Sequence, residues 1–216
     1  MAKTGARPRK AASPTASNGA RGLATKARIE EAALDLFYRQ GFRTTTMREI
    51  TSACDLTPAA FYNHFAAKED LLLSLIEQTF ERLEATMNAA VEDTDETSRA
   101  QLIALVRAMT LWHCDNSRIA RIANREAIEL GREQLQAVNH RRRRLRGMIE
   151  QTIVEGGEAG EFDLPGTHQA VARVLATSVL DLVRAIPDGR QPNLTPESLA
   201  DLFSTLVLRM VGAPPK

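Results

Sequence analysis

The segment Thr44–Leu71, TTTMREITSACDLTPAAFYNHFAAKEDL, carries the start signals of two short helices separated by a tight turn. Thr46 followed three residues later by Glu49 is a capping box, which starts the first helix. Thr57 and Pro58 form the second signal, an N-cap residue followed by proline at the first helical position. The segment therefore predicts two successive helices with only a few residues between them.

We expect the first of these helices to end near Ala53 and the second to end near His64. Their apolar side is supplied by Ile50, Leu56, Phe61 and Phe65. Two short helices around a tight turn make a helix-turn-helix, whose second helix can enter a DNA major groove about 12 Å wide.

The exposed face of the second helix combines small and hydrogen-bonding side chains: Thr57, Ala59, Ala60, Asn63 and His64, with Tyr62 at its edge. Small residues let the backbone approach the bases. Alanine can contact a thymine methyl group, and Thr or Asn can bond to base edges or phosphates. Lys68 lies in the first turn of the next helix, where the helix dipole opposes a cation. A bound phosphate would explain a lysine there; an ordinary solvated lysine is the alternative.

From Ala27 to Leu71 the chain resembles the TetR/AcrR family of one-component transcriptional regulators. The resemblance rests on these residues: Thr46, Ile50, Ala53, Leu56, Thr57, Phe61, Tyr62, His64, Phe65, Lys68, Glu69 and Leu71. Asp55 stands where the family prefers glycine, but aspartate tolerates the left-handed conformation better than most residues. Ala59 stands where the family commonly has Gly or Ser. Ala67 replaces the usual Ser cap before Lys68.

The resemblance implies roles for individual residues. It implies that DNA phosphates are held by Thr46, Tyr62, His64 and Lys68, and that the base edges are faced by Thr57, Ala59, Ala60 and Asn63. Packing against the first helix is an alternative role for Tyr62, and His64 can also be an ordinary surface residue. The resemblance further implies that the second domain binds a small molecule and dimerises through its last two helices.

The rest of the chain shows helical periodicity almost throughout, which predicts an all-α protein of about nine helices. We expect a basic disordered arm over residues 1–22, a three-helix DNA-binding domain over 23–70, and a helical ligand-binding and dimerisation domain over 71–216. The arm is rich in Ala, Ser, Thr, Pro and Gly, so it buries too little apolar surface to offset the entropy of ordering. A solubilising tail and a phosphate-contacting arm are equally good interpretations of it.

Two apolar stripes mark the last two helices, expected near 167–186 and 196–211. The first consists of Val171, Val174, Leu175, Ser178 and Leu182; the second of Leu199, Leu202, Phe203, Leu206 and Met210. We expect both to pair with a second copy of the chain. The alternative is that both belong to the core of one chain.

The effector pocket is expected among the central helices, where a few polar groups interrupt apolar ones. Its candidate wall is Met109, Trp112, His113, Ile119, Ile122 and Ala123, although side chains of this kind at helical spacing are more often core residues than ligand contacts. Glu126 is expected on one helical stripe with Ile122, Ala123 and Leu130. Arg141 and Arg142 flank the apolar stripe of the next helix, and Arg143 and Arg144 point away from it. The basic run at 140–144 is interpreted as a mostly solvated face rather than a nucleic-acid patch. Glu126 pairing with one of the flanking arginines, Arg141 or Arg142, is one interpretation, and an arginine that binds an acidic ligand is the other. Trp112 and the sequence RIARIANRE also resemble relatives that sense coenzyme A thioesters.

Charge, cysteine count and the length of apolar runs limit the kinds of protein that this chain can be. The 216 residues carry 28 Lys and Arg and 27 Asp and Glu, but residues 1–29 hold seven basic residues and no acid. The net charge of +1 therefore excludes only a uniformly basic protein. Two cysteines fit a reducing compartment, and no apolar run has the length of a membrane span or a secretory signal, which predicts a cytoplasmic protein. No pattern of a catalytic, cofactor or metal site is present.

These observations predict a homodimeric regulator that binds a palindromic double-stranded DNA operator. We expect a repressor that is released when a small hydrophobic or acyl-CoA-like effector binds between the central helices. A DNA-binding protein without an effector, which recruits a protein partner, is the alternative. A helical enzyme that merely carries the motif is a weaker hypothesis, because no catalytic groups occur at a credible spacing.

Overall fold

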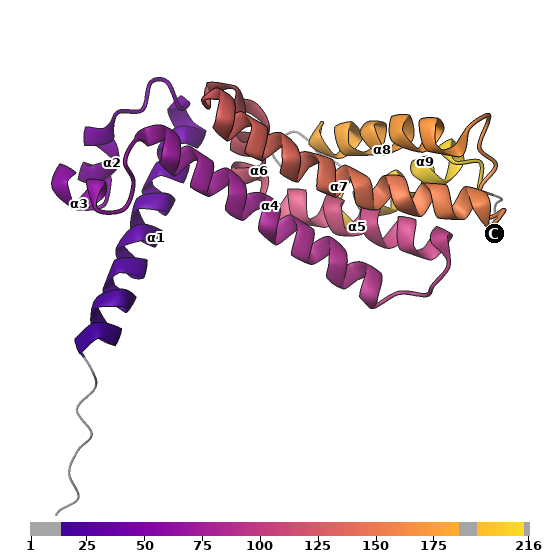
Figure 1. Ribbon diagram of the computed structural model, residues 1–216, viewed down its shortest axis with the longest axis horizontal. Coiled ribbons are helices and arrows are strands. Elements are labelled where there is room, and N and C mark those ends of the chain that lie inside the picture. The colour runs from indigo at the N-terminus through magenta and orange to yellow at the C-terminus, as the bar shows by residue number, and fades with distance from the viewer. Residues whose placement is uncertain (1–13, 186–193, 214–216) are drawn as a thin grey trace, which may run out of the picture.

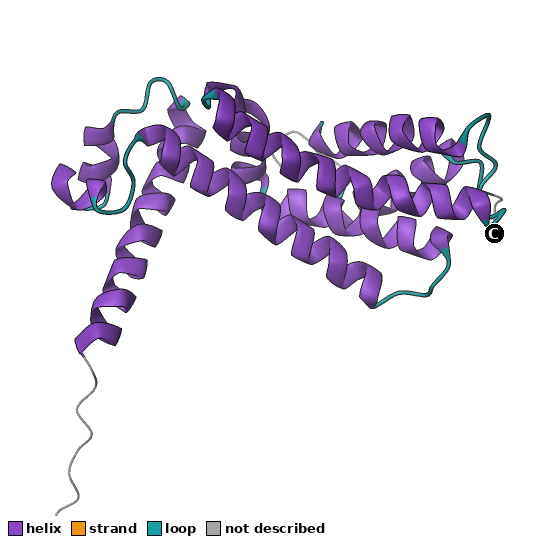
Figure 2. Ribbon diagram, viewed as in Figure 1, coloured by secondary structure: helices purple, strands orange, loops and turns teal. Residues whose placement is uncertain are grey.

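Helices account for all the regular elements in the described part of the chain, residues 14–185 and 194–213 of a computed structural model (Figures 1 and 2). The elements are α1 (Pro14–Gln40), α2 (Met47–Ala53), α3 (Pro58–Tyr62), α4 (Lys68–Glu92), α5 (Ser98–Asp115), α6 (Ser117–Arg125), the 3-10 helix η1 (Glu126–Glu129), α7 (Arg132–Glu158), α8 (His168–Arg184) and α9 (Pro196–Met210). The predicted all-α class and the nine α-helices are confirmed for these residues.

The N-terminal domain packs α1, α2 and α3 around a small apolar core. Ile29, Ala33 and Phe37 lie four residues apart on α1, so they share one face of the helix, and all are at most 1% exposed. They meet Ile50 of α2 and Phe61 of α3, which are completely buried. The core therefore uses the apolar positions that the sequence pattern indicates, and it leaves the opposite sides of α2 and α3 exposed.

The N-terminal helix is longer than expected. We predicted a disordered arm over residues 1–22, but α1 begins at Pro14, so residues 14–22 are helical. Proline is favoured at a helix start and the alanines that follow favour the helical state, which outweighs the glycine content of this stretch. Its first turns project away from the other helices (Figure 1). Residues 1–13 of the predicted arm lie outside the described residues.

Helix α4 crosses the expected domain boundary at residue 70 without a break. It begins at Lys68, beside the helix-turn-helix, and runs on to Glu92 among the helices of the second domain (Figure 1). Polar contacts hold α1 against it, because the Glu30 carboxylate accepts hydrogen bonds from Ser74 at 2.9 Å and Gln78 at 2.6 Å. The two domains are thus joined by a shared helix.

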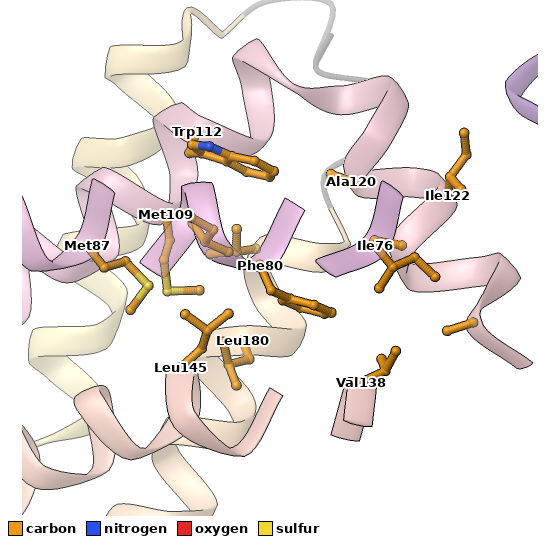
Figure 3. Close-up of a cluster of buried hydrophobic side chains, with 14 of the residues drawn as sticks. Ile76, Phe80, Met87, Met109, Trp112, Ala120, Ile122, Val138, Leu145 and Leu180 are labelled. Carbon is orange, nitrogen blue, oxygen red and sulfur yellow. The ribbon is translucent and has the colours of Figure 1, made fainter. Parts of the chain in front are cut away.

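The second domain is a bundle of α4, α5, α7, α8 and α9, with α6 packed against α1 and α4. Leu102 and Leu105 of α5, Val138 and Ile149 of α7 and Val183 of α8 are at most 1% exposed and form the centre of its core. Part of this core is drawn in Figure 3. Within the described ranges, no helix is both long enough and apolar enough to cross a membrane.

The two apolar stripes of the C-terminal helices divide between the core and the surface. Leu199 and Phe203 of α9 are buried in the chain's own core, contrary to the expectation that they face a second copy. Val174 of α8 remains 65% exposed, and three residues of α9 remain between 36% and 43% exposed: Leu202, Leu206 and Met210. We refer to these four exposed residues as the apolar stripe.

Two glycines of α7 differ in the space around them and provide a test of this packing. A Cβ atom on Gly156 would lie 2.2 Å from a ring carbon of buried Phe162, so Gly156→Ala must displace that ring. We expect the free energy of unfolding to fall by about 1–3 kcal/mol, as in other overpacked cores. Gly147 has nothing within 4 Å of such a Cβ, so Gly147→Ala should stabilise the helix by up to about 1 kcal/mol. Urea denaturation of both variants measures the difference, and equal effects would contradict the packing described.

Candidate DNA-binding and ligand-binding sites

The start of α2 is fixed by a complete capping box. The hydroxyl of Thr46 accepts a hydrogen bond from the Glu49 amide at 3.2 Å, and Glu49 Oε2 accepts from the Thr46 amide at 2.7 Å. Glu49 Oε2 also accepts from the Thr46 hydroxyl at 2.8 Å. These bonds lower the pKa of Glu49, so its carboxylate stays ionised at neutral pH. The Thr46 side chain is exposed beside this cap, and its phosphate contact remains a prediction.

The turn between α2 and α3 depends on Asp55. Asp55 has φ +49°, the left-handed conformation that was expected where relatives prefer glycine, and that expectation is confirmed. Arg28 of α1 donates to the Cys54 carbonyl at the end of α2, and the Leu56 amide donates to the Thr51 carbonyl at 2.9 Å. The angle between the two helices is therefore held both by local bonds and by α1.

Helix α3 exposes the side chains that were predicted to read bases. Thr57 caps the helix by accepting from the Ala60 amide at 3.2 Å, and Thr57, Ala59 and Asn63 are exposed, whereas Ala60 is half-buried. Tyr62 is 59% exposed, and its ring meets that of buried Phe61 edge-on at 5.7 Å. This face is available for contact with DNA.

The expected extent of α3 was too long. The α-helix ends at Tyr62, so Asn63 is its C-cap and His64 lies outside it, half-buried. The His64 and Phe65 amides both donate to the Phe61 carbonyl, at 2.8 and 3.1 Å, and this tightens the chain after the helix. His64 therefore does not continue the helical face of Ala59 and Asn63.

Lys68 has a structural role that the sequence did not indicate. Its Nζ donates to the carbonyls of Phe42 and Thr45, both at 2.7 Å, and lies 4.3 Å from the centre of the Phe42 ring. These contacts, rather than solvent, occupy two of its three N–H groups. The third can still meet a phosphate, so the predicted phosphate contact becomes an additional role for a residue that holds the α1–α2 loop.

Sequence reasoning missed Arg48, which is exposed on the first turn of α2. It lines a surface groove of about 470 Å³ together with Pro58 and Tyr62. Arg48 is the only basic residue in α2, and this could have identified it as a phosphate contact. It adds positive charge directly beside the exposed face of α3.

The candidate pocket wall is largely packed core. Met109 is 1% exposed, Ile122 is 2% exposed and Trp112 is 7% exposed, among the side chains of Figure 3. His113 is half-buried and its Nδ1 lies 2.8 Å from the Met109 carbonyl oxygen. Burial lowers its pKa, so the ring is neutral at neutral pH. Trp112 also lines a second cleft, of about 280 Å³, with Leu34 of α1.

The charged candidates are not brought together as expected. Glu126 begins the 3-10 helix η1 instead of continuing α6, so its predicted place on one α-helical stripe with Leu130 is wrong. Arg141 bonds to Glu81 at 2.9 Å and lies 3.9 Å from Glu84, both on α4. Arg142 donates instead to the Ala123 carbonyl at 3.1 Å. Arg141 and Arg142 therefore have partners other than Glu126.

Two family models match this chain, one over the helix-turn-helix domain and one over the second domain. A family model described as bacterial regulatory proteins of the tetR family matches residues 29–75, and one described as a tetracyclin repressor-like C-terminal domain matches residues 95–211. The second match alone covers more than half of the chain. The chain belongs to the TetR family. Its members are transcriptional regulators rather than enzymes.

Similar proteins, described as HTH-type transcriptional regulators or as members of the tetR family, are found among both sequences and structures. UidR of Escherichia coli K12 is 35% identical over 68 residues, and YerO of Bacillus subtilis is 48% identical over 52 residues. These matches cover 32% and 24% of this chain but only 35% and 18% of the relatives. A TetR-family regulatory protein from Rhodococcus RHA1 is 30% identical with a TM-score of 0.78, over 88% of this chain and 98% of its own.

A further similar structure, AibR in complex with isovaleryl coenzyme A and operator DNA, is 24% identical to this chain. Its TM-score is 0.74, over 88% of this chain and 100% of AibR. At this level of identity the likeness concerns the fold alone. Both the helix-turn-helix and the second domain therefore have the architecture of the family.

The role of Lys68 can be tested by Lys68→Met in this TetR-family chain. Because the substitution leaves the Phe42 and Thr45 carbonyls without their charged donor, we expect a loss of about 1–3 kcal/mol in the free energy of unfolding. Lys26→Met is the matched control. It removes a partly exposed ion pair with Glu30, whose loss should cost under about 1 kcal/mol. Equal losses in urea denaturation would mean that the Lys68 contacts add little.

Proposed function

We propose that the chain is a ligand-responsive repressor that binds a palindromic operator as a homodimer and is released by a small effector. The observation that carries the proposal is the exposed face of α3, with Thr57, Ala59 and Asn63 on a helix-turn-helix of the TetR family. A major groove accommodates one such helix, and these side chains suit contact with base edges.

The contacts with the DNA backbone would surround this face. Tyr62 is exposed at the end of α3, Thr46 and Arg48 are exposed at the start of α2, and the remaining N–H of Lys68 is a further donor. Phosphate contacts set the orientation and most of the salt dependence of DNA binding, whereas Asn63 and the neighbouring alanines would set the sequence preference.

The proposed homodimer is supported by the apolar stripe. Val174, Leu202, Leu206 and Met210 are exposed although their neighbours on α8 and α9 are buried, and a stripe of this kind suits pairing with an identical stripe. A two-fold dimer presents two copies of α3 to two half-sites about one DNA turn apart. The palindromic operator follows from that symmetry.

The proposed effector is a small hydrophobic or acyl-CoA-like molecule. The similar structure of AibR contains isovaleryl coenzyme A together with operator DNA, which supports this class of effector for the present chain. An effector that prefers one arrangement of the two domains would change the separation of the recognition helices. Because α4 is common to both domains, it is the element through which such a change would pass. DNA and effector would then weaken each other's binding by linkage.

The dimer can be tested by Leu206→Glu. Two carboxylates would be buried at the centre of the paired stripes, so we expect the variant to sediment as a monomer and its operator affinity to fall at least tenfold. Ile128→Glu is the control, since Ile128 is 77% exposed on η1, away from the apolar stripe. A Leu206→Glu variant that remains a dimer would contradict the proposed interface.

The whole proposal is tested by selecting an operator from random duplex DNA and measuring its release. We expect a palindrome of two half-sites, with a relaxed base preference for Asn63→Ala. Isovaleryl coenzyme A, followed by fluorescence anisotropy of labelled operator, should lower the affinity roughly 5- to 150-fold, the usual range of coupled sites. Unchanged affinity with bound effector would contradict the release mechanism. Operator binding with no effector response would favour a regulator that recruits a protein partner.

A further inference from the structure

A cleft of about 460 Å³ lies between α7 and α8, outside the packed core. Four of the side chains that line it are arginines, of which Arg142, Arg143 and Arg146 come from α7 and Arg184 from α8. Residues three and four apart on a helix share a face, which places the three α7 guanidinium groups along one wall. The cleft is therefore strongly basic, although the net charge of the chain is only +1.

The positive charge at one end of the cleft is not neutralised by the partners that the structure gives these arginines. Arg142 donates to the Asn139 side chain at 3.5 Å and to the Ala123 carbonyl, and Arg143 donates to the Asn139 carbonyl at 3.3 Å. All these acceptors are neutral. Burial and the charge of Arg184 both lower the pKa of Arg142, so the two cations repel each other across the cleft.

At the other end the acidic partners are shared or exposed. Glu150 lies 3.9 Å from Arg146 and 3.4 Å from Arg173, so one carboxylate serves two arginines. Arg184 has Asp181 at 3.3 Å, but the Asp181 side chain is 65% exposed to solvent. Exposed ion pairs of this kind contribute little. The excess of positive charge is therefore greatest at the end that holds Arg142 and Arg143, whose acceptors, the Asn139 and Ala123 oxygens, are all neutral.

Two donors inside the arginine wall make no hydrogen bond, although Arg146 Nε has a Glu150 oxygen 3.9 Å away. Within the described residues, the buried Nε atoms of Arg142 and Arg146 have no hydrogen-bond partner. Buried donors are rarely left in this state in folded proteins. Because the two residues are four apart on α7, their guanidinium groups are suitably spaced to share one anionic ligand.

The cleft is rotated around α8 from the centre of the predicted dimer face. Thr177 and Arg184, seven residues apart, share one face of α8. That face is rotated by about 120° from the centre of the predicted dimer face around Val174, Ser178 and Leu182, at 3.6 residues per turn. Pairing centred on that predicted face leaves the arginine cleft accessible, and Val174, the α8 member of the apolar stripe, lies about 70° from the cleft, at the near edge of the interface.

We propose that the arginine cleft binds the phosphate groups of a phosphorylated effector. This inference rests on the proposed function, because it names the part of the molecule that senses the polar end of the ligand. Guanidinium groups bind phosphate oxygens through paired hydrogen bonds, and four of them suit a ligand with more than one negative charge better than a single carboxylate. The acyl part of such an effector would lie elsewhere in the second domain.

The test measures binding of coenzyme A to the full-length dimer by isothermal titration calorimetry. Coenzyme A should bind, whereas pantetheine, which has the same thiol arm without phosphates, should bind at least tenfold more weakly. Pyrophosphate, which has the phosphates without the rest of coenzyme A, should also bind at least tenfold more weakly than coenzyme A. Equal affinity for pyrophosphate and coenzyme A would overturn the proposal, because the cleft would then be a simple anion site.

Variants locate the binding in the cleft. Arg142→Gln combined with Arg184→Gln should weaken coenzyme A binding at least tenfold. Arg143→Gln, at an exposed position that packing does not depend on, should weaken it at least threefold even if the double variant fails to fold. Arg144→Gln is the matched control, because Arg144 lies in the same arginine run but pairs with Glu84 of α4. A control that loses as much affinity as the cleft variants would overturn the proposal.

Operator release separates this inference from the proposed function. If isovaleryl coenzyme A releases the operator equally from the wild type and from the cleft variants, the proposed function stands and the cleft assignment is wrong. If coenzyme A binds in the cleft but acyl-CoA never affects operator binding, the phosphate site stands and the effector-response part of the proposed function is wrong.

Discussion

The ammonium group of Lys68 is the contact on which the arrangement of the N-terminal domain depends. It lies at the first turn of α4, where the helix dipole disfavours a cation, and the Phe42 and Thr45 carbonyls compensate for this. The same two bonds fix the loop between α1 and α2, so they set where the helix-turn-helix lies relative to α4. Because α4 continues without a break into the second domain, the position of α3 is tied to the bundle that holds the proposed ligand site.

Further contacts reinforce this connection between the domains. Arg118 of α6 bonds to Asp35 of α1 at 2.9 Å, and Glu30 of α1 bonds to Gln78 of α4. A displacement of α4 or α6 in the second domain therefore acts on α1, which in turn holds the end of α2 through Arg28. Contacts of this kind are the physical basis for coupling between ligand and DNA, provided that the two ligands favour different arrangements.

The arginine run at residues 141–144 shows how tertiary structure assigns different roles to identical side chains. The sequence predicted a mostly solvated face there, but Arg141 and Arg144 bond to glutamates of α4, and Arg142 and Arg143 line the cleft against α8. Arg143 and Arg144 were both expected to point away from the apolar stripe of their helix, yet one lines the cleft and the other pairs with Glu84. Only the positions of α4 and α8 on opposite sides of α7 distinguish the four residues.

The sequence by itself determined the local structure of this protein: the capping box at Thr46, the proline start of α3, the left-handed turn at Asp55 and the helical class. These features depend on neighbouring residues, so spacing in the chain is enough to predict them. The tertiary structure decided the roles of Lys68, Glu126 and the arginines, and which half of the α9 stripe is buried. Such roles depend on elements far away in the sequence, since burial and ion pairing are set by whichever helix packs alongside.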